Sequence, residues 1–181
     1  MQVYGLSGLP GSGKSEVGKI AIEHGFPVIR MGDMVWENVR KLGLPLEPEI
    51  VGRIAHQRRE LEGPGIWASV TVEHINAIIE SSPLDFIVID GVRSTFEADI
   101  FRAEFDNFKL VAVHSSPRVR YNRIMARKRV DDAISYEAFM DRENRELSWG
   151  AAQVVALADI MLVNEGSLSE LQERSMELFQ G

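Results

Sequence analysis

Residues 8–15 carry the clearest chemical signal in the chain, because they match the pattern G-x-x-x-x-G-K-[ST] in full. Glycines let the main chain turn with positive φ and come close to phosphates, and successive N–H groups then point inward as an anion site. The lysine adds a point charge for the β- and γ-phosphates, and the serine hydroxyl suits Mg²⁺. The segment therefore predicts a site for the phosphates of ATP or a close analogue. Its residues are Gly8, Leu9, Pro10, Gly11, Ser12, Gly13, Lys14 and Ser15.

The sequence around this segment agrees with the prediction. A short apolar run precedes it at residues 2–7, and an amphipathic helical pattern follows it at residues 16–24. The alternative, a glycine-rich turn between a strand and a helix that binds no ligand, is disfavoured by the length of the pattern and by this context.

Asp90 is a second candidate for the same site. It ends the apolar run at residues 86–89, which is typical of a buried strand. Ligands of open α/β sheets gather at the carboxyl ends of the strands, and an acid there commonly holds Mg²⁺ through water. The alternative is a turn aspartate, since Asp-Gly is a common turn pair.

Several arginines could stabilise charge during phosphoryl transfer or grip an acceptor phosphate. Arg123 and Arg127 lie four apart on one predicted helix face, and Arg142 and Arg145 lie three apart on the next helix. Arg93 closely follows Asp90. The alternative for the helical pairs is two solvated faces with acidic partners. Those partners would be Glu137, Glu143 and Glu146.

Other polar residues give weaker signals. Arg58 and Arg59 are candidates for contact with an acceptor, with solvent exposure as the alternative. Asp33 could orient an acceptor or a magnesium-bound water, or could instead cap a helix. Surface positions are expected for Arg118, Arg120 and Lys128. Core or hinge packing, rather than stacking on a base, is expected for Trp36, Trp67 and Trp149.

The elements that must position these residues alternate between short apolar strands and longer helical patterns, which predicts an α/β fold with a parallel sheet. Five strands are predicted, at residues 2–7, 26–30, 85–90, 109–114 and 159–163. Helices are predicted at residues 16–24, 117–127, 135–149 and 167–179, and over most of residues 31–82 with breaks at 43–48 and 63–65.

The composition and net charge limit the classes of protein to which the chain can belong. The chain has 181 residues, 45% hydrophobic and 26% charged, which fits one folded domain over residues 1–181. A net charge of −7 disfavours a broad surface for nucleic acid or anionic membrane. There is no cysteine, which excludes a disulfide framework and a thiolate metal site. Because no signal peptide and no apolar stretch of spanning length are evident, we expect a cytoplasmic protein. Its oligomeric state stays open.

Motifs along most of the chain resemble those of adenylate kinases and dephospho-CoA kinases. Residues 32–34 resemble a Gly-Asp-Met step, and residues 90–94 an Asp-Gly-Phe-Pro-Arg-Thr segment shortened by one residue. Residues 123–127 resemble paired lid arginines, and residues 164–167 a loop near the nucleotide base. The chain is most similar to an archaeal group of P-loop proteins related to these kinases.

The resemblance implies a three-layer P-loop NTPase fold, a helical acceptor-binding insert at residues 31–82 and a short lid at residues 127–135. It implies contacts with the nucleotide from Arg123, Asn164 and Gly166. Two departures concern the acceptor: the proline of the third motif is absent, and Trp36 stands where an acceptor arginine is common, with Arg40 one turn further on.

Our first hypothesis is a small-molecule kinase that uses Mg²⁺ and ATP. Lys14, Arg127 and Arg129 would neutralise charge as the phosphoryl group passes to a nucleoside monophosphate or a CoA precursor. Arg93 is a further catalytic candidate, and Asp33 would act as a base if the acceptor were a hydroxyl. The second is a nucleotide-dependent switch or ATPase that regulates a protein partner. A kinase acting on RNA or DNA ends is disfavoured by the acidic net charge.

Overall fold

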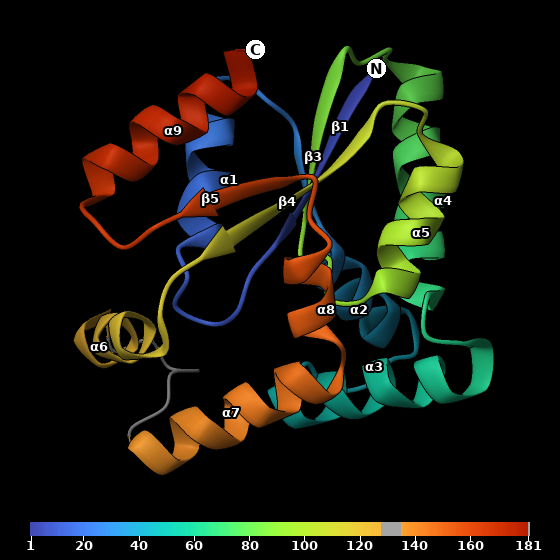
Figure 1. The fold of residues 1–181 in the computed structure, drawn as a ribbon. Coiled ribbons are helices and arrows are strands. Elements are labelled where there is room, and N and C mark those ends of the chain that lie inside the picture. Colours follow the sequence, from blue (N-terminus) through green and yellow to red (C-terminus); the bar gives the residue numbers. More distant parts are fainter. Residues whose placement is uncertain (128–134, 181) are drawn as a thin grey trace.

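The computed structural model describes residues 1–127 and 135–180, and within them one parallel sheet lies between layers of helices (Figure 1). The strand order is β2-β3-β1-β4-β5. The strands are β1 (Gln2–Ser7), β2 (Val28–Arg30), β3 (Phe86–Asp90), β4 (Phe108–His114) and β5 (Ile160–Val163). This architecture confirms the predicted fold class.

Helices cover both faces of the sheet. The helices α1 and α9 pack together over one face, while α4, α5 and α8 cover the other, and α3 and α7 lie beyond the sheet (Figure 1). Their bounds are α1 (Lys14–Glu23), α2 (Met31–Lys41), α3 (Pro48–Glu62), α4 (Ile66–Ser81), α5 (Thr95–Glu104), α6 (Pro117–Arg127), α7 (Tyr136–Ser148), α8 (Ala151–Ala156) and α9 (Leu168–Gln180). None of these helices is both long and apolar enough to span a membrane.

The central strands bring the candidate residues to one edge of the sheet. Val3, Leu6 and Ile87 are fully buried, as expected for parallel strands covered on both faces. Leu6 of β1 lies opposite Asp90 of β3, and Ser7 lies opposite Ala112 of β4. The phosphate-binding segment therefore leaves the middle of the sheet directly beside Asp90.

Two helices of the structure were not predicted from the sequence. One is α5, which begins after a capping box in which the Ser94 hydroxyl accepts from the Glu97 amide while the Glu97 carboxylate accepts from the Ser94 amide. The other is α8, a helix of six residues that follows the positive-φ residue Gly150. The expected helices over residues 31–82 are present as α2, α3 and α4.

Candidate functional site

A pocket of about 600 Å³ opens at the carboxyl edge of the sheet, around the predicted phosphate-binding segment. All eight residues of that segment line it. The rest of the wall comes from the end of β1, from α1, from the β3–α5 connection and from α6, α7 and α8. Those lining residues are Ser7, Glu16, Gly91, Val92, Arg93, Arg123, Ala126, Arg127, Arg142, Glu146 and Ala151.

The glycines of the segment are required by its geometry. Gly11 has φ 82°, and a Cβ there would lie 2.7 Å from the main-chain oxygen of Arg120. Gly13 has φ 103° and caps α1 without any side-chain hydrogen bond. The Glu16 and Val17 amides already donate to the Gly13 carbonyl, so the amides of Lys14 and Ser15 are the ones at the start of α1 that can meet an anion in the pocket.

Lys14, which lines this pocket, is brought together with Asp90, which does not line it. The Lys14 ammonium donates to a carboxylate oxygen of Asp90, and both side chains are largely buried. The charged end of the lysine and the predicted magnesium acid thus share one location, next to the hydroxyl-bearing Ser15 that also lines the pocket. Within the described part of the chain, no group of three or more His, Asp or Glu residues could hold a metal by itself.

A buried network supports the segment from behind. The Asn164 side-chain amide donates to the Ser12 carbonyl at 2.8 Å, and the Ser115 hydroxyl lies 3.2 Å from the same carbonyl. The Arg123 guanidinium donates to the Ser115 hydroxyl at 2.9 Å, to the Asn164 side-chain oxygen at 3.2 Å and to the Gly166 carbonyl at 3.1 Å. Asn164 and Gly166 do not line the pocket, so their direct contact with a nucleotide stays a prediction.

The predicted surface position of Arg120 is wrong, because the residue is buried. Only 2% of Arg120 and 8% of Glu143 are exposed. The two side chains form a bidentate pair, with Arg120 Nη2 2.5 Å from Glu143 Oε1. Arg120 also donates to the Ser115 carbonyl at 2.9 Å and to the Pro10 carbonyl at 3.3 Å. Glu143 is therefore part of the scaffold under the phosphate-binding segment instead of a solvated helix face.

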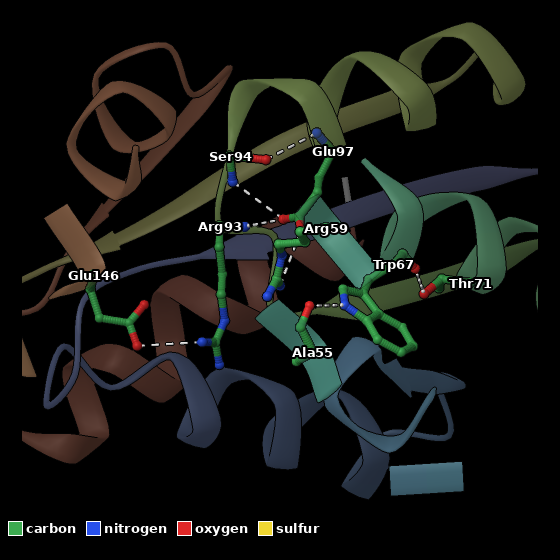
Figure 2. A network of polar contacts seen from close by, with 8 residues as sticks. All are labelled: Ala55, Arg59, Trp67, Thr71, Arg93, Ser94, Glu97 and Glu146. Atoms are coloured by element: carbon green, nitrogen blue, oxygen red, sulfur yellow. Dashed lines mark hydrogen bonds and ion pairs between the residues drawn. The ribbon is translucent and has the colours of Figure 1, made fainter. Parts of the chain in front are cut away.

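Arg93 lines this pocket. Its main chain is held by Glu97 at the start of α5, as Figure 2 shows. The Glu97 carboxylate accepts from the Arg93 amide at 2.7 Å and lies 3.6 Å from the Arg59 guanidinium. Burial raises the pKa of Glu97, while these hydrogen bonds and the nearby arginines act in the opposite direction. The Arg93 guanidinium reaches Glu146 of α7 at 3.4 Å.

Other expected residues lie outside this pocket. Asp33 is exposed in the first turn of α2, whose N-cap is Arg30, so the capping alternative for Asp33 is wrong. Arg58 pairs with Glu62 at 2.6 Å along α3 and does not line the pocket. Arg129 and most of the predicted lid, residues 128–134, lie outside the described residues.

Comparisons with known proteins show the family of this chain. The family model for an AAA domain matches residues 7–139. A UPF0200 protein of Pyrococcus furiosus is 41% identical over 169 residues, 92% of this chain and 90% of the relative. The chain belongs to the UPF0200 family. The expected likeness to an archaeal group of P-loop proteins is confirmed.

Solved structures extend the likeness to the fold of small-molecule kinases. A dephospho-CoA kinase from Campylobacter jejuni superposes with a TM-score of 0.58 at 16% identity, over 99% of this chain and 96% of that one. A shikimate kinase from Bacteroides thetaiotaomicron gives 0.61 at 14% identity, over 99% of both chains. At these identities the likeness shows the fold alone, a P-loop kinase-like fold.

Proposed function

We propose that this protein is a kinase that transfers the γ-phosphoryl group of MgATP to a small phosphate-bearing acceptor, a nucleoside monophosphate or a dephospho-CoA-like molecule. The observation that carries the proposal is the composition of the pocket. A complete phosphate-binding segment faces four arginines, counted among the described residues, from three separate parts of the chain. They are Arg93, Arg123, Arg127 and Arg142.

The donor would bind along the segment at residues 8–15. Main-chain amides at the start of α1 and the Lys14 ammonium would hold the β- and γ-phosphates. The Ser15 hydroxyl and the Asp90 carboxylate would hold Mg²⁺. This donor set suits Mg²⁺, which is commonly bound by one or two protein oxygens together with water and substrate phosphates. When bound, the ion would neutralise phosphate charge.

The reaction breaks the bond between the γ-phosphorus and the oxygen that bridges to the β-phosphate, and forms a bond to an acceptor oxygen. Charge spreads over the equatorial oxygens of the transferred group, and an arginine that meets it is worth on the order of 10³–10⁵ in rate. Lys14 and Arg127 are the residues we assign to this role, with Arg129 of the lid as a further candidate. Arg93 would grip the acceptor phosphate. A phosphate acceptor needs no base, whereas a hydroxyl acceptor would need one, for which Asp33 remains our only candidate.

One observation favours the alternative of a nucleotide-dependent switch or ATPase. Trp36 stands where the kinase resemblance would place an acceptor arginine, and it packs against the apolar core. Arg40, one turn further on, does not line the pocket around the phosphate-binding segment. Water would then take the place of the acceptor.

Incubation with Mg-ATP and a panel of nucleoside monophosphates and dephospho-CoA tests the proposal. ADP release is followed together with the mass of each acceptor. A kinase shows ADP release that one acceptor stimulates, with that acceptor gaining one phosphate. Slow ADP release that no acceptor changes would refute the kinase assignment and support the switch.

A further inference from the structure

A second pocket, of about 320 Å³, lies beside the first and shares Arg93 with it. Its walls come from α3 and the connection that follows it, from the start of α5, and from the last residue and C-cap of α7. The residues that matter for the argument are Arg59, Pro64, Arg93, Phe96, Glu97 and Trp149. A molecule that filled this pocket would end at the same arginine that faces the phosphate-binding segment.

The second pocket is built for a flat apolar group. Trp149 and Phe96 line it and are exposed by 37% and 59%, so both rings are accessible to a bound molecule. The Arg59 and Arg93 guanidinium carbons lie 5.9 and 5.7 Å from the Trp149 ring centroid. The indole thus already receives planar cations, and a planar heterocycle would stack on it by taking the place of one of them.

The polar groups of this pocket are already engaged with one another. Glu97 accepts hydrogen bonds from the amides of Arg93 and Ser94 and faces Arg59. His56 lies 3.3 Å from Glu60, one turn along α3. An acceptor rich in hydroxyls would have to compete with these contacts, whereas a ring needs only the aromatic surface.

Arg93 links the two pockets electrostatically. Its contact with Glu146 is long, at 3.4 Å, and its side chain is 46% exposed, so the contact is weak and readily exchanged for a phosphate. Figure 2 shows the side chain running from the start of α5 to Glu146 on α7. A phosphate held there would lie between the ring pocket and the phosphate-binding segment.

We propose that the second pocket binds the planar heterocyclic ring of the acceptor, stacked on Trp149, with the acceptor phosphate at Arg93. This inference rests on the proposed kinase function and narrows its acceptors to ring-bearing molecules of the nucleoside monophosphate class. Trp149 is then a specificity-determining residue that sequence analysis assigned to packing.

The test measures binding of adenosine 5′-monophosphate and of ribose 5-phosphate to the full chain with saturating MgADP, by calorimetry and tryptophan emission. The monophosphate should bind and change the emission, and ribose 5-phosphate should bind at least about 10-fold more weakly, as expected for loss of one stacked base. Trp149→Leu should lose about 10-fold in affinity for the monophosphate, and Trp149→Phe should keep most of it. Trp36→Phe removes a tryptophan outside the pocket and serves as the matched control.

Equal affinity for the two probes, or an unchanged affinity in Trp149→Leu, would overturn the inference. If Trp149→Leu does not fold, the comparison of the two probes on the wild-type chain decides. Phosphorylation of a ring-free acceptor, with no dependence on Trp149, would refute the ring pocket while the kinase function stands. Ring binding that depends on Trp149, without any phosphoryl transfer, would refute the kinase function and leave the ring pocket in place.

Discussion

Removal of Arg120 should destabilise the protein more than removal of any exposed arginine. The side chain pairs with Glu143 and also donates to the carbonyls of Ser115 and Pro10. Arg120→Met would leave the Glu143 carboxylate buried beneath the phosphate-binding segment without its partner. Breaking a buried pair in this way costs about 3–5 kcal/mol of the free energy of unfolding.

That cost translates into a large thermal effect. For a chain of this size, about 1 kcal/mol corresponds to about 2–4 °C in Tm, so we expect a fall of about 6–20 °C. Glu143→Leu should cost a similar amount, since it leaves the arginine uncompensated. The double variant should cost much less than the sum of the two single costs, because replacing both ends of a buried pair is often neutral. The carbonyls that lose their donors would retain a cost of about 1 kcal/mol each.

Thermal and urea unfolding of the four proteins in this cycle would measure the coupling between the two residues. Arg118→Met, which alters a neighbouring residue of the same helix that is exposed to solvent, is the control and should change Tm by less than about 2 °C. The reasoning is refuted if Arg120→Met costs less than 1 kcal/mol, or if the two single costs simply add in the double variant.

Three further predictions concern the site. Lys14→Ala should abolish ADP release and leave the circular dichroism spectrum unchanged, because the Lys14 ammonium contributes more to phosphate binding than to the stability of the fold. Asn164→Leu should lower the free energy of unfolding by about 1–3 kcal/mol, measured by urea, because the Ser12 carbonyl loses a buried donor. In Glu97→Gln, the Tm relative to wild type should rise as pH increases above about 4.3, since burial raises the folded-state pKa of Glu97.

The sign of the pH effect follows from the two states of Glu97. A carboxyl whose pKa is raised by folding stabilises the folded state fully at pH values below its unfolded pKa. That contribution is lost as pH rises through the folded-state pKa, and glutamine does not titrate. If the Tm of Glu97→Gln instead fell relative to that of wild type as pH rose, the raised pKa of Glu97 would be contradicted. ADP release by Lys14→Ala would contradict the role of the Lys14 ammonium. A free energy of unfolding in Asn164→Leu equal to that of wild type would contradict the support of Ser12 by Asn164.

The phosphate-binding segment was predictable because its requirements are local. Positive φ, close approach and an available helix start all fall within residues 8–15, so the residue types record them directly. The burial of Arg120 was not predictable in this way, since its partner Glu143 lies 23 residues away and on another helix. A hint existed: Arg120 lies four residues from the buried Ile124 on the same helix.

The missed helix α5 had a usable signal, whereas the aromatic pocket had none. Ser94 and Glu97 have the spacing of a capping box, which predicts a helix start. The exposure of Trp149 depends on how α3, α5 and α7 meet, and no pattern within one segment reports it. Likewise, the hydrogen bond from Asn164 to Ser12 joins residues that lie 152 apart in the chain, and no local pattern predicts it.

The central claim is that main-chain amides and the Lys14 ammonium hold a polyphosphate at the start of α1. Calorimetric titration of the wild-type chain and of Lys14→Ala with MgATP tests it most directly. We predict saturable heat with one site per chain for wild type and at least a 10-fold weaker affinity for Lys14→Ala, since a charge-assisted contact is worth about 1.5–3 kcal/mol. Absence of heat for wild type, or equal affinities for the two proteins, would contradict it.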